Sequence, residues 1–147
     1  MLLKSDEPTL VLTNLKKVFW PDEGYTKRDL LDYYREIAPV ILPYLKDRPQ
    51  VLHRHVDGHE GKEFFQRISR GQPSWVQTAR ITGRRGERPF VLCQNWPTLL
   101  WMANFGCVEL IPWNSRIESV VCRIGFSFAT VPDSGVAWRR VFNSRSL

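Results

Sequence analysis

The strongest periodic pattern in the sequence predicts one long helix. Its apolar residues are three or four positions apart, which is the spacing of one helical face: Leu30, Tyr34, Ile37, Ile41 and Leu45. Thr26 is followed three residues later by Asp29, the pattern of a capping box, so we expect the helix to begin there. Pro39 and Pro43 lie inside the pattern and predict a kink near Ala38 or a break into two shorter helices.

The remaining pattern predicts a second helix and several strands. The second helix is expected over residues 96–105, because Pro97 lies in its first turn and Gly106 follows where a helix would end. Apolar runs and alternation predict strands at residues 9–13, 50–56, 64–68, 78–82, 89–93 and 108–111. Residues 14–24 are expected to form a turn-rich loop, and a hairpin is expected across residues 83–86. The order of elements predicts an α+β fold, with a mixed sheet and two main helices.

Composition indicates a folded protein with an affinity for anions. The 147 residues fit one domain, and 43% hydrophobic residues, with six Trp and eight Phe, exclude a disordered chain. A net charge of +6 is typical of a protein that binds nucleic acid. We find neither an apolar stretch of about 18 residues nor a secretion signal, so we expect no membrane contact and a cytoplasmic location.

The last fifth of the chain differs from the rest in its charge and in its pattern of apolar residues. Residues 120–147 contain four arginines and one aspartate, which supply half of the net charge of +6. Their apolar positions show no clear period. We therefore divide the chain into residues 1–119 and a basic tail over residues 120–147. A shifted reading frame or a disordered extension would produce such a tail, and a divergent but genuine C-terminus is the alternative.

Metal-dependent catalysis finds little support in the residue pattern. Two-metal chemistry on phosphates needs converging carboxylates, and Asp-x-Asp on a strand is a common way to place two of them. No two acidic residues in the chain are two positions apart. His53, His55 and His59 have a spacing that can present imidazoles to zinc, but the third lies beyond the turn at residues 57–58. We therefore interpret them as a polar strand end and predict no metal site and no catalytic residue.

Basic residues next to aromatic residues are the remaining candidate chemistry. They occur at residues 16–20, 25–28, 53–55 and 64–67. Cations anchor phosphates, and aromatic rings stack on bases for roughly 1–3 kcal/mol each. Alternation along a strand predicts that one of Phe64 and Phe65 enters the core and that only the other is free to stack.

Several short motifs follow one another in a specific order over residues 9–119. They are Leu-Thr-Asn-Leu-Lys-Lys-Val-Phe-Trp-Pro at residues 12–21, Gly-Tyr-Thr-Lys at 24–27, Asp-Arg-Pro at 47–49, Phe-Phe-Gln at 64–66, Leu-Leu-Trp-Met-Ala-Asn at 99–104 and Pro-Trp-Asn-Ser-Arg at 112–116. In this order and spacing the chain resembles the primase-polymerase domain of bacterial ligase D. That family belongs to the archaeo-eukaryotic primase superfamily and serves non-homologous end joining. The resemblance covers about the first half of the family's domain.

The resemblance implies binding of DNA ends. Lys17 and Lys27 correspond to the lysines with which the family grips the 5′-phosphate of a gapped or broken end. A helix N-terminus at Thr26 would add its partial positive charge there. His53 and Arg54 correspond to a basic pair that contacts DNA, with histidine in place of the more usual lysine.

The resemblance also implies a stacking surface, cofactors and partners. Phe64 and Phe65 correspond to the family's platform for bases at the DNA end. Intact members use manganese or magnesium to add nucleotides from nucleoside triphosphates to a primer. They act with a DNA ligase and with the Ku end-binding protein.

Departures from the family pattern concern the catalytic residues. The family has an Asp-x-Asp strand shortly after the segment at 112–116, whereas residues 120–125 of this chain contain no acidic residue. Ile111 replaces a histidine expected near the nucleotide. We therefore expect a DNA-end-binding chain that lacks nucleotidyl transfer and holds no cofactor of its own. The alternatives are half of a split nucleotidyltransferase completed by another chain, and a non-functional remnant with exposed sheet edges.

Overall fold

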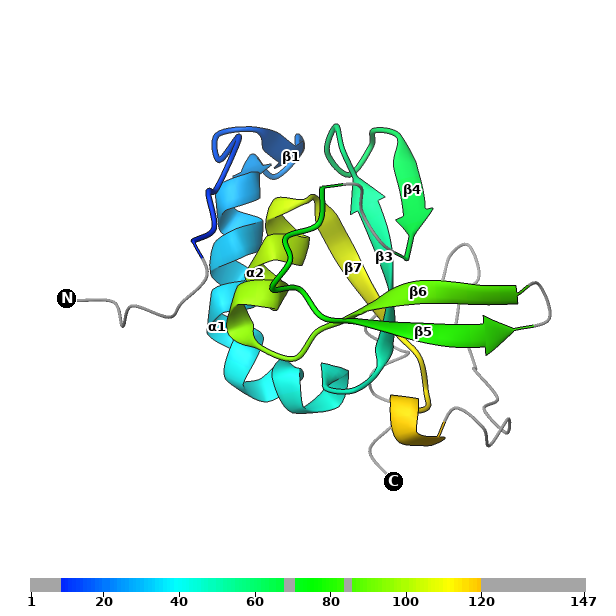
Figure 1. Cartoon of the computed structure of the whole chain (residues 1–147). Coiled ribbons are helices and arrows are strands. Elements are labelled where there is room, and N and C mark those ends of the chain that lie inside the picture. Colours follow the sequence, from blue (N-terminus) through cyan, green and yellow to red (C-terminus); the bar gives the residue numbers. More distant parts are fainter. Residues whose placement is uncertain (1–8, 68–70, 84–85, 120–147) are drawn as a thin grey trace, which may run out of the picture.

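The computed structural model describes residues 9–67, 71–83 and 86–119, so the basic tail at 120–147 lies outside the described residues. The elements follow the order β1 (Val18–Trp20), β2 (Tyr25–Thr26), α1 (Lys27–Leu45), β3 (Pro49–His55), β4 (Glu63–Gln66), β5 (Thr78–Gly83), β6 (Gly86–Leu92), α2 (Trp96–Asn104) and β7 (Cys107–Pro112), with a short 3-10 turn at Ile117–Ser119. This arrangement confirms the predicted α+β class with two main helices (Figure 1).

Strand β3 is the centre of the five-stranded sheet. Along one edge it pairs with β7, so that Leu52 lies opposite Leu110. Along the other edge it pairs first with β6, where Gln50 lies opposite Val91, and then with β4. Strands β5 and β6 form the predicted hairpin, which extends away from the helices (Figure 1). Every pairing in the described part of the sheet is antiparallel.

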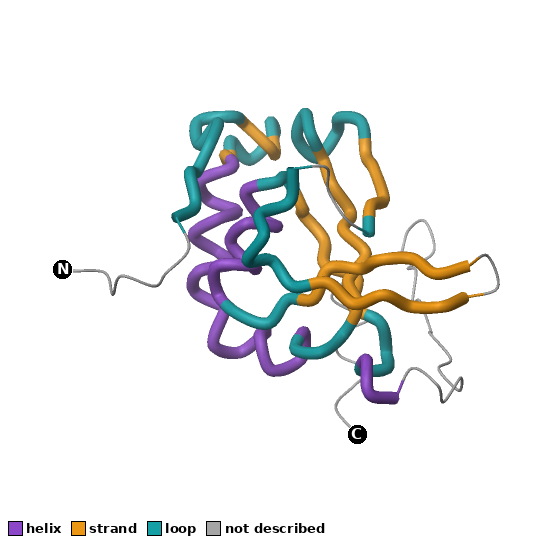
Figure 2. The backbone as a smooth tube through the Cα atoms, viewed as in Figure 1, coloured by secondary structure: helices purple, strands orange, loops and turns teal. Residues whose placement is uncertain are grey.

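The two helices lie together on one side of this sheet (Figure 2). The core fills the space between them and β3, and its members at 0% exposure include Leu52, Val91, Leu99 and Met102. Burying side chains of this size contributes about 1.5–3 kcal/mol each. Within the described residues, neither helix is long and apolar enough to cross a bilayer.

Helix α1 begins and ends where the sequence predicts. The Asp29 carboxylate accepts hydrogen bonds from the backbone N–H and the hydroxyl of Thr26, at 2.6 and 2.7 Å. Of the two predicted alternatives, a kink near Ala38 or a break into two helices, the break does not occur: α1 is one element from Lys27 to Leu45. Pro39 and Pro43 both lie on its exposed side, so water can bond to the carbonyls that lose a helical partner.

The prediction of a strand at residues 9–13 is wrong. This segment runs beside α2, where Asn104 accepts a hydrogen bond from the Thr13 N–H and donates one to the Val11 carbonyl, both at 3.0 Å. A helix has used most of its own backbone groups, so it offers a passing segment side-chain partners only. The loop expected at 14–24 contains the short strand β1, which pairs with β2.

Gly106 occupies a position that only glycine fits, between α2 and β3. Its φ is +84°, its carbonyl accepts the His55 N–H at 2.8 Å, and a Cβ there would lie 3.1 Å from the His55 carbonyl oxygen. We expect Gly106→Ala to lower the free energy of unfolding by about 2–3 kcal/mol. The cost of a left-handed backbone at alanine and the cost of the close contact add to each other. Urea unfolding measures this. The control Gly24→Ala, at φ +74° with nothing within 4 Å, should lose only about 1 kcal/mol. Equal losses would contradict a role for the close contact.

Candidate functional site

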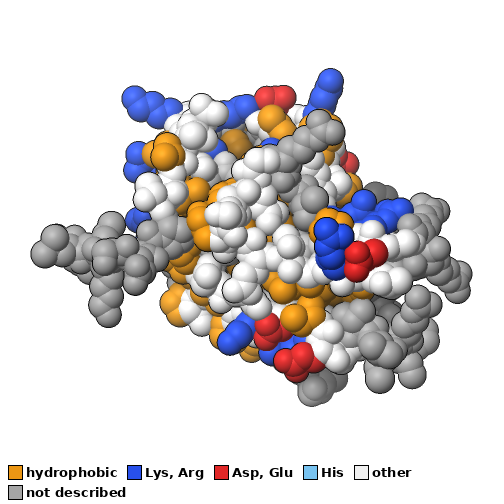
Figure 3. Space-filling view, in the orientation of Figure 1, with side chains coloured by type: hydrophobic (Ala, Val, Ile, Leu, Met, Phe, Trp, Pro, Cys, Tyr) orange, Lys and Arg blue, Asp and Glu red, His pale blue; other side chains and the backbone are white. Residues whose placement is uncertain are grey.

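A small polar cavity lies where the 13–17 loop, the start of α1 and the end of α2 meet. Its volume is about 190 Å³, and its lining combines three cationic side chains with backbone and amide groups. The cations are Lys17, Lys27 and Arg54, and we call this space the cation cavity. In the same part of the molecule, Lys and Arg side chains project along the upper edge, above β1 and the β3–β4 connection (Figure 3).

Backbone hydrogen bonds bring the first two cations together. The Lys17 N–H bonds to the Asn14 carbonyl at 2.9 Å, which closes the loop. The Lys27 N–H then bonds to the Lys17 carbonyl at 2.8 Å, so the loop is tied to the first turn of α1. Asn14 adopts a φ of 55°, in the left-handed region that asparagine tolerates. The Asn-Leu-Lys-Lys motif and the Thr-Lys motif therefore form one structural unit.

Lys27 is the most constrained of these cations. It is 5% exposed, and its Nζ donates to the carbonyl and the hydroxyl of Thr13, at 2.7 and 3.3 Å. No carboxylate pairs with it among the described residues. Burial, followed by the nearby charges of Lys17 and Arg54, lowers its pKa to about 8. A buried ammonium group that faces two other cations favours the entry of an anion.

Lys17 and Arg54 are each held in place by neighbouring groups. The Lys17 Nζ donates to the Val56 carbonyl at 2.6 Å and to the Asp57 carboxylate at 2.9 Å, and this contact lowers the pKa of Asp57. The Arg54 Nε donates to the Phe105 carbonyl at 2.8 Å, and its guanidinium lies 3.3 Å from the centre of the Phe105 ring. These contacts orient both cations before any ligand arrives.

The structure separates the two residues of the predicted basic pair. Neighbouring residues on a strand point to opposite faces, so Arg54 faces the helices and His53 faces away from them. The His53 ring lies between two carboxylates, 2.9 Å from Glu109 and 2.8 Å from Glu63. Burial lowers the pKa of His53, but the hydrogen bonds and charges of these carboxylates outweigh it and raise the pKa overall. His53 is therefore not part of the cation cavity.

Phe64 and Phe65 are both exposed, at 45% and 62%. The prediction that one of them enters the core is wrong, because β4 lies at the end of the sheet and neither helix packs on it. The Phe65 ring stacks on His53 with a centroid distance of 4.2 Å. It also lines a shallow groove of about 500 Å³ together with Arg67 and Trp113.

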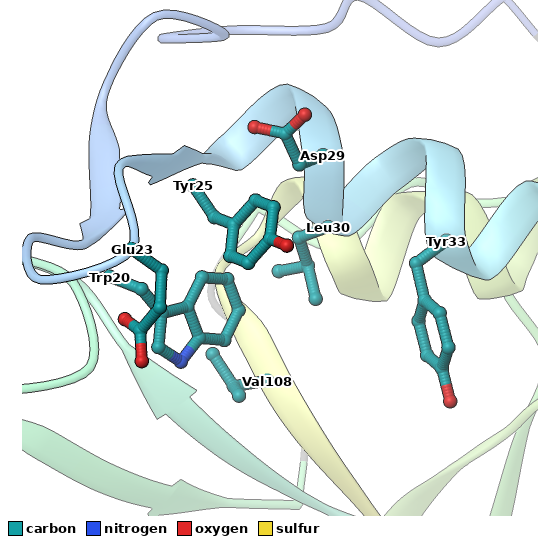
Figure 4. Close-up of a pocket in the computed structure, with 7 residues that line it drawn as sticks. All are labelled: Trp20, Glu23, Tyr25, Asp29, Leu30, Tyr33 and Val108. Atoms are coloured by element: carbon teal, nitrogen blue, oxygen red, sulfur yellow. The ribbon is translucent and has the colours of Figure 1, made fainter.

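A second, mostly apolar cavity of about 530 Å³ lies between the β1–β2 turn, α1 and β7. Trp20, Tyr25 and Tyr33 supply its aromatic walls (Figure 4). Among the described residues that line it there is no lysine or arginine, so this lining is not suited to phosphate. The sequence pattern did not indicate this cavity, nor the place of Thr13, Asn104 and Phe105 in the lining of the cation cavity. The motif at 99–104, which contains Asn104, was the available signal for that side.

Comparisons with known proteins agree with the resemblance. The family model described as "LigD, primase-polymerase domain" matches residues 26–144. The chain is 32% identical over 100 residues to the multifunctional non-homologous end joining protein LigD of Mycolicibacterium smegmatis, covering 67% of this chain and 13% of that protein. It is 30% identical over 107 residues to the corresponding DNA repair protein of Mycobacterium tuberculosis, covering 72% and 14%.

A solved structure is also similar. It is the polymerase domain from Mycobacterium tuberculosis ligase D in complex with DNA, with a TM-score of 0.72 and 30% identity, covering 75% of this chain and 39% of that one. The chain thus spans about one seventh of the length of its curated relatives. The family match continues past residue 119, where the sequence analysis placed the limit of the resemblance. The origin of the 120–147 tail stays a prediction.

Proposed function

The chain belongs to the ligase D primase-polymerase family, and from this membership we propose that it binds DNA ends carrying a 5′-phosphate during non-homologous end joining. The observation that carries the proposal is the buried Lys27 ammonium, which shares a cavity of about 190 Å³ with Lys17 and Arg54. A phosphate monoester has the negative charge that Lys27 lacks among the described residues, and acceptor oxygens for the remaining N–H groups of all three cations. The similar polymerase domain described in complex with DNA supports this class of ligand.

The cavity distinguishes a terminal phosphate from a phosphate inside a strand. A terminal phosphate monoester carries up to two negative charges, whereas an internal phosphodiester carries one. Lys27 is nearly inaccessible, at 5% exposure, so only a group that enters the cavity can contact it. We therefore propose that Lys27 contacts the terminal phosphate. Lys17, at the more exposed rim, attracts the DNA end and positions it.

We assign contacts with DNA bases to Phe64 and Phe65 on β4, which we call the aromatic edge of the sheet. Phe65 has one face on His53, and 62% of the residue is exposed. Phe64, at 45% exposure, precedes it on β4 opposite Arg54 in the register, so its ring points to the other face of the sheet. Stacking on such rings stabilises unpaired bases by roughly 1–3 kcal/mol each and is tolerant of sequence. In this proposal His53 contributes to DNA binding by supporting the Phe65 ring. A DNA ligase and Ku are the partners that the proposal implies for the longer family members.

The proposal is tested with a gapped duplex that has either a 5′-phosphate or a 5′-hydroxyl at the gap. We expect the full chain to bind the phosphorylated duplex about tenfold more tightly, since a charged hydrogen bond contributes about 1.5–3 kcal/mol. Fluorescence anisotropy measures both affinities. Lys17→Gln should weaken binding and reduce the slope of log affinity against log salt by about one.

Arg35→Gln is the matched control. Arg35 is exposed on α1, and its ion pair is with Asp32 at 3.7 Å, away from the cavity. The variant loses one charge, as Lys17→Gln does, but should keep the preference for the phosphorylated duplex. Equal affinity of the folded wild-type chain for the two duplexes would refute the proposal.

A further inference from the structure

A second cluster of side chains lies on the face of the sheet that points away from the helices. His53 and His55 are two positions apart on β3, so their side chains share this face. Glu63 on β4 is directly opposite His55 in the register. One ligand atom from each of His53, His55 and Glu63 lies within 4.8 Å of the others. Two imidazoles and a carboxylate thus converge on one point.

Both imidazoles are oriented by a contact at Nδ1. The Nδ1 of His53 is 2.9 Å from a carboxylate oxygen of Glu109. The Nδ1 of His55 is 3.2 Å from the carbonyl oxygen of His59, which can only accept a hydrogen bond. Metal-binding histidines in proteins are usually held this way, with the second nitrogen donating to a carboxylate or a backbone carbonyl. The arrangement leaves Nε2 of each ring available as a ligand.

Distances and exposure are compatible with a cation at this point. The His53 Nε2 is 2.8 Å from a carboxylate oxygen of Glu63. Two bonds of about 2.0–2.1 Å in tetrahedral geometry place such atoms roughly 3.3 Å apart, so a small movement of Glu63 is enough. Its side chain is 58% exposed and can make that movement, while the His53 side chain, at 11%, stays fixed. Solvent can supply a fourth ligand from the Glu63 side.

We propose that His53, His55 and Glu63 bind one zinc ion, with water in the fourth position, and that Glu109 orients His53. Nitrogen ligands with one carboxylate suit zinc, whereas magnesium and calcium prefer oxygen ligands alone. From the sequence we predicted no metal site at the His-x-His-x-x-x-His spacing, and the proposed site uses only its first two histidines: the His59 ring packs 5.6 Å from that of His55 but lies outside the cluster, where Glu63 takes the third place. The proposed zinc site is also separate from the cation cavity, which lies on the other face of β3.

The proposed ion has a consequence for the aromatic edge of the sheet. Phe65 stacks directly on His53, so a ligand bound to His53 lies next to the exposed ring. Without the ion, the carboxylates of Glu63 and Glu109 place negative charge beside this ring. A divalent cation offsets both charges and makes the edge more compatible with a polyanion. The existence of the site does not depend on the proposed DNA binding.

Cobalt titration of the full chain, without an affinity tag and freed of metal with EDTA, tests the site. Tetrahedral cobalt with nitrogen and oxygen ligands absorbs visible light strongly, so the absorption should saturate at one equivalent and disappear on addition of zinc. A site made of His53, His55 and Glu63 should give no sulfur-to-cobalt band in the near ultraviolet, and among the described residues Cys93 and Cys107 are buried and outside the cluster. A folded chain that gives no visible absorption would overturn the proposal.

Substitutions separate this site from adventitious binding. Glu63→Gln changes an exposed side chain and should abolish the cobalt absorption without unfolding the protein, and His55→Ala should do the same. Glu109→Gln should weaken metal binding roughly 10–100-fold, as the loss of an orienting partner does in other metal sites. His59→Ala is the control and should leave the absorption unchanged, because its backbone carbonyl is retained. Absorption that survives Glu63→Gln and His55→Ala, or that is lost in His59→Ala, would overturn the assignment.

Discussion

Replacing Lys27 by methionine is expected to abolish the preference for a 5′-phosphate and, at the same time, to stabilise the fold. The ammonium is the cation most deeply placed in the cavity, at 5% exposure. The wild-type preference corresponds to one hydrogen bond between charged partners and is about tenfold, so affinity for the phosphorylated duplex should fall roughly tenfold, to that for the 5′-hydroxyl duplex. Affinity for the 5′-hydroxyl duplex should change little. Anisotropy with the two gapped duplexes measures both effects.

The stabilising effect follows from the lowered pKa of Lys27. Its pKa is about 8 in the folded chain because of burial and the charges of Lys17 and Arg54, against roughly 10.4 in an unfolded chain. The folded state therefore binds this proton less tightly than the unfolded state, so the ammonium lowers stability below pH 8. After discounting for solvent screening, we expect Lys27→Met to gain about 1 kcal/mol at pH 7. The gain should fade as the pH rises from 8 towards 10.

Thermal unfolding at several pH values measures this gain, which corresponds to a Tm increase of about 2–4 °C at pH 7. Lys16→Met is the matched control, because Lys16 is exposed in the same loop and should alter neither the phosphate preference nor the pH dependence of stability. Retention of the phosphate preference by Lys27→Met would remove Lys27 from the proposed site. A loss of stability at pH 7 would show that its bonds to Thr13 outweigh the burial of its charge.

Primer extension by the 147-residue chain alone is expected to be undetectable with manganese or magnesium and nucleoside triphosphates. Two-metal transfer needs carboxylates that converge on both ions, and the chain contains no Asp-x-Asp. At the position of the histidine expected near the nucleotide it has Ile111, which is 40% exposed on β7. A gel assay on a gapped, 5′-phosphorylated template measures extension. Extension that persists through repurification and is lost in Lys27→Met would contradict this prediction.

The same assay tests the alternative of a split nucleotidyltransferase. The similarity to a solved polymerase domain of ligase D is the observation that keeps a polymerase reaction in view. If another chain supplies the catalytic carboxylates, extension should appear only when that chain is added. It should then remain sensitive to Lys27→Met, because the proposed end-binding cavity is in this chain.

Local signals in the sequence determined much of the secondary structure. The Thr26 and Asp29 pair predicted the start of α1, and the apolar period predicted its end at Leu45. Gly106, at φ +84°, ends α2 as expected. These features depend on hydrogen bonds and periodicities within a few residues, so the sequence alone can show them.

Elements that depend on a distant partner were predicted less well. Residues 9–13 have the composition of a strand, but the neighbour that the fold provides is α2, so no ladder forms. Strand β1 is three residues long and exists because β2 lies beside it. Phe64 has the sequence context of a core residue and is 45% exposed, because neither described helix packs on β4. The strand propensity of a segment does not show which surface the segment packs against in the folded protein.

For the candidate site, the sequence by itself identified Lys17, Lys27 and Arg54 through family motifs and the pattern of basic and aromatic residues. Only the tertiary structure decided their environment. It joins Lys17 to Lys27 through a loop, and it separates Arg54 from His53 across a strand. It also places His53 against Glu109, 56 residues away in the chain. The physical reason is that residue type sets the charge that a side chain can carry. Its electrostatic environment is set by burial and by neighbours that are distant in sequence.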